Sequence, residues 1–122
     1  MESIDVLLDT NVLIKIWRGD ELLEKEVDRL NCAIDTTVYL EFLQGANKNQ
    51  LTKTELFLKR FTLIPFAPGI TFRAIKLIKK HSHANGLRMP DALIAAASLE
   101  NDLPLLTLNT KHFVFVEGIK LI

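Results

Sequence analysis

The chain has 122 residues, of which 48% are hydrophobic and 25% are charged, and its formal net charge is zero. This length predicts one domain covering residues 1–122, and the composition is that of an ordinary globular protein. The sequence has no apolar run long enough to cross a bilayer, no signal peptide at residues 1–5 and a single cysteine, Cys32, so we expect a cytoplasmic protein without a membrane partner.

The charges cancel in total but are unevenly distributed along the chain. Residues 56–90 contain no Asp or Glu, whereas they contain Lys59, Arg60, Arg73, Lys76, Lys79, Lys80 and Arg88. A local cationic surface is typical of a polyanion contact, because phosphate binding depends on local charge more than on net charge. The same residues also fit the solvated face of a surface helix, and the sequence leaves both interpretations open.

The first predicted element is a buried parallel strand at residues 4–8, since this mostly apolar run leads directly into helix-like sequence. Asp9 ends the run, and in open α/β sheets ligands bind outside the carboxyl ends of such strands. We therefore expect Asp9 at the rim of a binding crevice, with Thr10 and Asn11 beside it. Asp9 also fits the cap of a helix predicted at residues 11–17.

The sequence next predicts an amphipathic helix at residues 20–30 and a short strand at 33–35. A third helix follows at residues 38–45, and residues 36–37 are expected to cap it. Glu41 has apolar neighbours on every side of this third helix and lies one position too late for a capping box. A buried carboxylate without a partner is costly, so we expect Glu41 to meet a cation. The alternative is that it reaches solvent through a narrow gap.

The remaining predicted elements are helices at residues 51–61, 70–83 and 90–97 and strands at 62–66, 105–108 and, at the sheet edge, 119–122. Pro90 marks the start of the last helix. Asp91 falls in its first turn, where the helix dipole stabilises an anion by about 0.3–1 kcal/mol. Because this helix is almost entirely apolar, we expect it to be buried, and Asp91 then places a charge at the edge of an apolar interior.

Three carboxylates, Asp9, Glu41 and Asp91, thus stand in unfavourable apolar settings far apart in the chain. If the fold brings them together, each pair about 4 Å apart repels by about 4 kcal/mol at an effective dielectric constant of about 20. A divalent cation removes this repulsion, and an all-oxygen ligand set favours Mg²⁺ or Mn²⁺ over zinc. Such a cation can activate a water and stabilise charge on a phosphodiester.

The same residues resemble the successive signatures of the PIN-domain nucleases. The matching segments are Leu8-Asp9-Thr10-Asn11, the apolar helix with Glu41 that ends Leu43-Gln44-Gly45, the stretch Pro90-Asp91-Ala92-Leu93-Ile94-Ala95-Ala96, and Thr107-Leu108-Asn109. Their order and spacing over essentially the whole chain are similar to those of VapC-type toxins.

The resemblance implies a three-layer α/β/α sandwich with a mainly parallel central sheet. It also implies an Mg²⁺- or Mn²⁺-dependent endoribonuclease that hydrolyses RNA with a metal-activated water, is inhibited by a VapB-like antitoxin and forms a homodimer. Asp9, Glu41 and Asp91 match the metal-binding catalytic acids of the family. Asn11 matches the polar residue beside the first acid, and Thr107 matches the hydroxyl near the pocket.

A fourth acid, which the family commonly has after the last strand, is missing here. Asn109 and His112 stand near the positions where it is expected. The amide oxygen of Asn109 can still bind a metal-bound water, but the number of metal ions stays open. The departure also keeps an alternative function open, a catalytically weakened PIN-like module that binds RNA or another protein.

Other polar residues fit structural roles better. Asp35 ends the second strand, where a turn or cap role is expected. His81 and His83 point to opposite sides of a helix, which disfavours zinc chelation. His112 is expected at the surface or at the pocket rim. The possible RNA contacts are Arg73, Lys76, Lys79, Lys80 and Arg88.

Two other acid-using classes of protein fit the sequence less well. A receiver domain needs adjacent acids after its first strand, where this chain offers only Asp9. Phosphatases with an Asp-x-Asp nucleophile need an acid where Asn11 stands.

Overall fold

The structure, a computed structural model, describes residues 3–122, which form a four-stranded parallel sheet with the order β3-β2-β1-β4. The strands are β1 (Val6–Leu8), β2 (Cys32–Asp35), β3 (Thr62–Ile64) and β4 (Leu105–Leu106). The helices are α1 (Thr10–Trp17), α2 (Glu21–Asp28), α3 (Thr36–Gln44), α4 (Leu51–Leu58), α5 (Pro68–Asn85) and α6 (Met89–Glu100), with short 3₁₀ turns η1 (Lys48–Gln50) and η2 (Thr110–His112).

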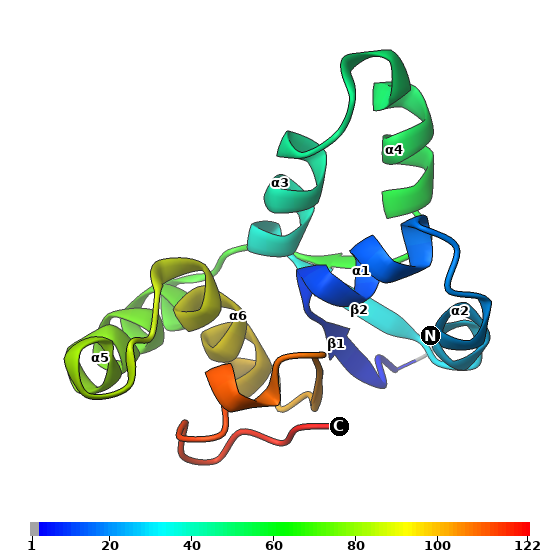
Figure 1. The fold of residues 1–122 in the computed structure, drawn as a ribbon. Coiled ribbons are helices and arrows are strands. Elements are labelled where there is room, and N and C mark those ends of the chain that lie inside the picture. The colour runs from blue at the N-terminus through cyan, green and yellow to red at the C-terminus, as the bar shows by residue number, and fades with distance from the viewer. Residues whose placement is uncertain (1–2) are drawn as a thin grey trace.

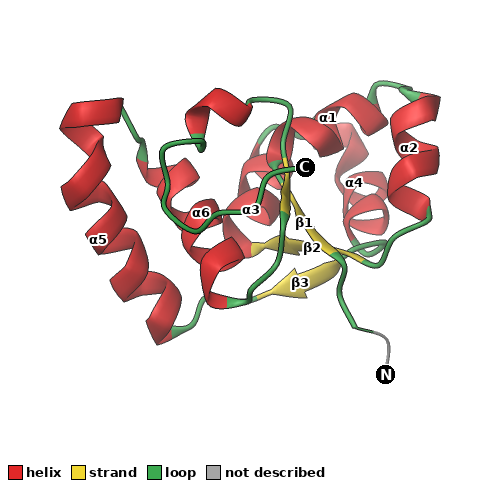
Figure 2. Ribbon diagram, turned by 90° about the horizontal axis from the view of Figure 1, so that it is seen from below, coloured by secondary structure: helices red, strands yellow, loops and turns green. Residues whose placement is uncertain are grey.

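The elements form the three layers that the sequence predicts. Figure 2 shows the sheet between α5 and α6 on one side and α1, α2 and α4 on the other. In Figure 1, α3 and α4 rise together from one end of the sheet. The predicted α/β/α sandwich with a parallel sheet is therefore confirmed. None of the helices within residues 3–122 combines the length and the hydropathy that a membrane span requires.

Strand β1 is the centre of the sheet because it pairs with strands on both sides. Its residue Leu7 lies opposite Ala33 of β2 and Leu105 of β4, and all three are fully buried. A strand covered on both faces must be apolar at every position, which explains the continuous apolar run at the start of the chain.

The strand order creates a topological switch point at the carboxyl ends of β1 and β4. From β1 the chain moves outward through β2 to β3, and it then returns through α5 and α6 to place β4 on the free side of β1. Ligands of open parallel sheets bind in the crevice at such a point. Asp9 and Thr107 directly follow these two strands.

Helix α6 buries mainly small side chains, together with Ile94. Ala92, Ala95, Ala96 and Ala97 are at most 1% exposed. The helix packs against α5 on one side and contacts α3 as well. Its first turn, which carries Asp91, is thereby held near the ends of the strands.

An aromatic cluster holds α3 and α4 against α1. The ring of Trp17 lies 5.7 Å from that of Phe42 and 5.2 Å from that of Phe57, and the last two are 5.4 Å apart. Edge-to-face and tilted pairs of this kind are favourable arrangements of aromatic rings. The cluster fixes the position of α3, and therefore of Glu41.

Several predicted boundaries differ from the observed ones. The third helix starts at Thr36, because Asp35 and not the following threonines provides its cap. The strand predicted at residues 62–66 ends at Ile64, since Pro65 has no N–H for a ladder hydrogen bond. The predicted edge strand at residues 119–122 is only an isolated parallel bridge between Leu105 and Leu121.

Candidate active site

Asp9 is fixed by hydrogen bonds to both of its carboxylate oxygens. It follows β1 and caps α1, where its Oδ1 accepts a hydrogen bond of 2.8 Å from the backbone N–H of Thr10. Its Oδ2 accepts a hydrogen bond of 2.7 Å from Thr107 Oγ1. The residue is only 5% exposed. A buried carboxylate is thus satisfied by neutral donors, with no lysine or arginine bonded to it among the described residues.

Thr107 connects the two sides of the switch point. Besides donating to Asp9, its Oγ1 accepts a hydrogen bond of 3.0 Å from the backbone N–H of Asn109. The hydroxyl therefore both donates and accepts a hydrogen bond, which fixes its orientation, as expected for a buried group. This arrangement places the segment after β4 beside the carboxylate that follows β1.

Glu41 lies on α3 and accepts a hydrogen bond of 2.7 Å from Thr10 Oγ1 to its Oε1. The expectation that it is enclosed on every helical face is wrong, because the side chain is exposed and the adjacent Leu40 is 55% exposed. One side of α3 therefore faces solvent, so the burial cost inferred from the sequence does not apply. Thr10, for which the sequence predicts only a place beside Asp9, links Glu41 to the start of α1.

Asp91 lies in the first turn of α6 and is partly buried. Burial raises the pKa of its carboxyl above the ordinary range, and the nearby charge of Asp9 and then that of Glu41 raise it further. His112 and Arg88 oppose these effects, and His112 Nδ1 lies 3.6 Å from Asp91 Oδ2. The three carboxylates are thus close enough to affect one another electrostatically.

These side chains line one pocket of about 490 Å³, here called the acidic pocket. Its lining includes Asp9, Thr10, Asn11, Ile14, Glu41, Arg88, Pro90, Asp91, Asn109 and His112. The structure therefore brings the three sequence-predicted acids together with Asn11 and Asn109. Thr107 lies behind the pocket and acts through its hydrogen bond to Asp9. His112 is on the rim, with its side chain about half exposed.

The predicted basic residues separate into two groups. Arg73, Lys76, Lys79 and Lys80 lie on α5 and do not line the acidic pocket. Two of them are paired with acids, Arg73 with Glu100 at 3.1 Å and Lys80 with Glu117 at 3.7 Å. Arg88, at the start of α6, does line the pocket.

The other polar residues have structural surroundings. His81 is buried, its Nδ1 lies 2.8 Å from Asn85 Oδ1, and its ring packs on Phe115. His83 is exposed. Asp35 is fully buried and its Oδ1 accepts a hydrogen bond of 2.9 Å from the backbone N–H of Val38, which is the cap role expected for it.

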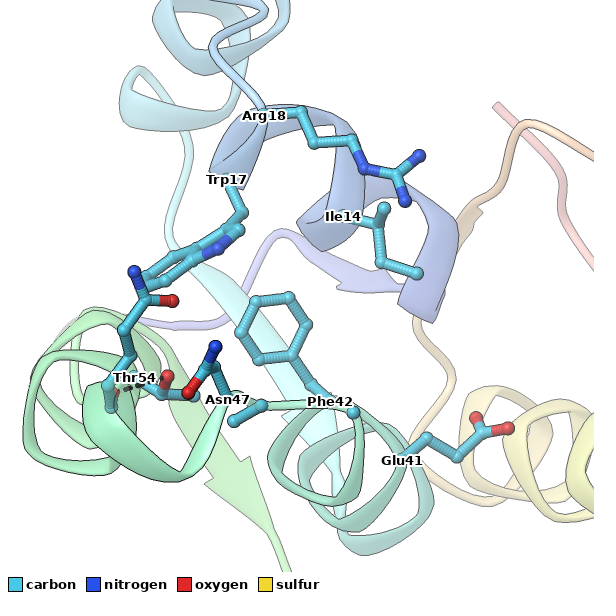
Figure 3. Close-up of a pocket in the computed structure, with 10 residues that line it drawn as sticks. Ile14, Trp17, Arg18, Glu41, Phe42, Asn47 and Thr54 are labelled. Atoms are coloured by element: carbon cyan, nitrogen blue, oxygen red, sulfur yellow. Dashed lines mark hydrogen bonds between the residues drawn. The ribbon is translucent and has the colours of Figure 1, made fainter.

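A groove of about 420 Å³ adjoins the acidic pocket and shares Ile14 and Glu41 with it. Figure 3 shows Trp17 and Phe42 turned towards this hollow, with Glu41 at one end and its carboxylate directed away from the aromatic rings. Asn47 and Thr54 line the other side. The groove therefore has an apolar middle, a polar far side and a carboxylate where it meets the acidic pocket.

The chemistry of the acidic pocket suits a hard divalent cation. The side chains that could act as ligands offer carboxylate and amide oxygens, which Mg²⁺ and Mn²⁺ prefer. Within residues 3–122, no three His, Cys, Asp or Glu side chains already stand in a metal-binding cluster. Carboxylates without a cation between them repel one another. Glu41 is exposed and its carboxylate accepts one hydrogen bond, from Thr10 Oγ1. Of the three acids, it is therefore the one that is free to reorient.

The fold and the pocket define a class of protein, an α/β/α domain with an acidic site at the switch point of a parallel sheet. The sequence profile described as the PIN domain matches residues 6–117. The chain therefore belongs to the PIN domain family, and the resemblance recognised in the sequence is confirmed.

Similar proteins agree with this assignment. The chain is 28% identical over 117 residues to Ribonuclease VapC of Rickettsia bellii, with 88% of this chain and 87% of that protein aligned. A chain of a toxin–antitoxin complex from Klebsiella pneumoniae is 30% identical with a TM-score of 0.80, covering 94% of this chain and 95% of its own. VapBC2 of Rickettsia felis, solved with a promoter DNA fragment, has a TM-score of 0.84 at 24% identity over 98% of each chain, which is a likeness of fold.

We expect Asp35→Asn to flatten the pH dependence of stability. Burial is the main cause that raises the pKa of the Asp35 carboxyl from 3.8 to about 6. The folded state therefore holds this proton more tightly than the unfolded state, and stability falls as the pH rises from about 4 to about 6. Between pH 4 and pH 7 the variant should gain about 2–3 kcal/mol relative to wild type, as measured by urea unfolding.

The asparagine keeps an acceptor for the Val38 N–H, and its buried amide N–H₂ adds a cost that does not change with pH. A stability difference that is the same at every pH would show that Asp35 does not titrate in this range.

Proposed function

We propose that the chain is an Mg²⁺- or Mn²⁺-dependent endoribonuclease and the toxin of a VapBC-type toxin–antitoxin pair. The observation that carries the proposal is the meeting of Asp9, Glu41 and Asp91 at one pocket. Capping and helix-dipole roles can explain Asp9 and Asp91 one at a time, but they do not explain why acids that follow β1 or lie on α3 and α6 share one pocket, where the charges of Asp9 and Glu41 raise the pKa of Asp91. A divalent cation and a phosphodiester give the arrangement a function.

The residues of the chain have distinct roles in this reaction. Asp9 is held by hydrogen bonds from Thr107 Oγ1 and the Thr10 N–H, and together with Asp91 it would hold the cation. Glu41, on the exposed side, would complete the ligand set. A bound Mg²⁺ or Mn²⁺ supplies charge stabilisation on the phosphodiester and activates water. Arg88, which lines the edge of the pocket, adds a positive charge that would attract RNA towards it.

We further propose that the antitoxin lies in the groove beside the acidic pocket. The apolar side chains of Trp17 and Phe42 suit a protein segment, and Glu41 at the junction suits a basic side chain. A segment in this groove would lie against Ile14 and Glu41, which also line the acidic pocket, so it would restrict access of RNA.

For the homodimer we propose the edge formed by β3 and α5. This part of the chain exposes Leu63, Phe66, Phe72 and Ile75, each at least 46% exposed. Exposed apolar side chains on neighbouring elements are typical of protein contacts.

Asp91→Asn should abolish RNA cleavage by the purified protein. The substitution keeps the size of the side chain but removes a charge that holds the cation, so we expect a loss of at least about 100-fold. The measurement is the cleavage rate of a structured RNA in Mg²⁺ or Mn²⁺. Glu100→Gln, at the other end of the same helix, is the matched control and should retain activity. Equal cleavage by wild type and Asp91→Asn would assign the activity to a contaminant, and absent cleavage would favour the weakened binding module.

Millimolar Mg²⁺ or Mn²⁺ should raise the melting temperature of the wild-type protein. At about 100 times the Kd, binding stabilises the folded state by about 2.7 kcal/mol, which corresponds to roughly 10 °C for a chain of this size. Asp9→Asn should lose the shift, whereas Glu21→Gln, an exposed acid on α2, should keep it. A wild-type protein that melts at the same temperature with and without either cation has no such site.

Ala46→Trp should weaken binding of the antitoxin. Ala46 lines the groove but not the acidic pocket, so a large side chain there fills the space of the incoming segment. Titration calorimetry with a VapB-like antitoxin that binds the wild-type protein should show a Kd at least about 10-fold higher for the variant. Leu22→Trp, on the exposed face of α2, is the control. Unchanged affinity in Ala46→Trp would place the antitoxin elsewhere.

A further inference from the structure

A second cavity of about 270 Å³ adjoins the acidic pocket on the side away from Glu41. The two share Arg88, Asp91 and His112, so these side chains form a common wall. Lys111 and Phe115 line the second cavity but not the first. We call this second hollow the basic cavity, because Arg88 and Lys111 contribute two cations to it whereas Asp91 is the one carboxylate in its lining.

The two cations are available for a ligand. Neither Arg88 nor Lys111 has an ion-pair partner among residues 3–122, whereas Arg60, Arg73 and Lys80 are each paired with an acid. Unpaired cations on a concave surface attract anions more strongly than the same charges on a convex face. The basic cavity therefore differs from the surface of α5, where part of the positive charge is already neutralised.

The wall of the basic cavity is a fixed structure. Gly86 ends α5 in the left-handed conformation with φ of 71°, and the following Leu87 is buried with its N–H bonded to the His81 carbonyl at 3.2 Å. The ring of Phe115 lies 4.9 Å from that of His81. Arg88, the next residue along this turn, is thereby presented between the two cavities.

We propose that the basic cavity binds the RNA phosphate next to the one at the carboxylates, between Arg88 and Lys111. This inference rests on the proposed function, because it takes RNA as the ligand and the acidic pocket as the site of the reacting phosphodiester. An RNA strand that crosses the common wall would place one phosphate at the carboxylates of the acidic pocket and a neighbouring phosphate at Arg88 and Lys111. Contacts of this kind position the strand and do not read its bases.

The test is binding of a short fluorescent single-stranded RNA to Asp9→Asn protein without divalent metal, followed by anisotropy. Adding Lys111→Gln should raise the Kd by about 3- to 10-fold and reduce the slope of log Kd against log salt by about 0.7, the value for one phosphate contact on a single strand. Lys25→Gln, an exposed lysine on α2 outside both cavities, is the matched control and should change neither quantity.

A second set of RNAs, each with one neutral methylphosphonate, locates the contact. The RNA with the methylphosphonate at one particular position should bind more weakly to the Asp9→Asn protein than the unmodified RNA does. This loss of affinity should disappear when Lys111→Gln or Arg88→Gln is added to the protein. Equal effects of Lys111→Gln and Lys25→Gln, absence of RNA binding, or a penalty that persists in both cavity variants would overturn the proposal.

The outcomes also separate the two proposals. If wild type does not cleave RNA but the methylphosphonate pattern is found, the nuclease function fails and the phosphate site stands. If wild type cleaves RNA and Asp91→Asn does not, while the pattern is absent, the nuclease function stands and the phosphate site fails.

Discussion

The hydrogen bond between Thr107 Oγ1 and Asp9 Oδ2 is the contact on which the site depends. It joins the ends of two parallel strands that are almost the whole chain apart, and it lies where the sheet reverses its strand order. With the second oxygen of Asp9 bonded to the start of α1, the carboxylate is held in one orientation without any cation. Loss of either donor would leave a buried charged group unsatisfied, which is among the costliest local defects.

The acidic pocket and the basic cavity lie side by side and carry opposite charge. On one side of the wall formed by Arg88, Asp91 and His112 the lining is acidic, and on the other side it is basic. Carboxylates alone would repel an RNA strand, whereas a purely basic surface would bind it without a place for a catalytic cation. In the proposed function, the two neighbouring hollows would serve these two purposes in a chain whose formal net charge is zero.

The aromatic cluster connects the groove with the acidic pocket. Phe42 follows Glu41 directly on α3, and its ring packs on Trp17 of α1. Thr10, at the start of the same α1, bonds to Glu41. A protein segment bound on the aromatic side would therefore touch the two helices that set the position of Glu41. The groove and the pocket therefore share residues of these two helices, Ile14 and Glu41.

The local features of the chain could be predicted from the sequence because they depend on neighbouring residues. The apolar run before Asp9 predicts a central strand, Pro90 predicts the start of α6, and the order of the motifs indicates the family. The cap of α3 was assigned to the threonines instead of Asp35, because both residue types have the required acceptor and only the backbone path decides between them.

Only the tertiary structure decided three features of the site and its surroundings. These are the exposure of Glu41, the pairing of Arg73 with an acid and the position of Arg88. Apolar neighbours along the helix suggested that Glu41 is buried, yet burial depends on what packs against that face, and here the face is open. Likewise, a run of basic residues gives no information on which of them meet an acid from another helix. The sequence by itself determined which acids are candidates for the site, because the motifs are local, and the structure shows that these acids line one pocket. Their geometry and the separation of acidic from basic hollows depend on contacts between residues far apart in the chain.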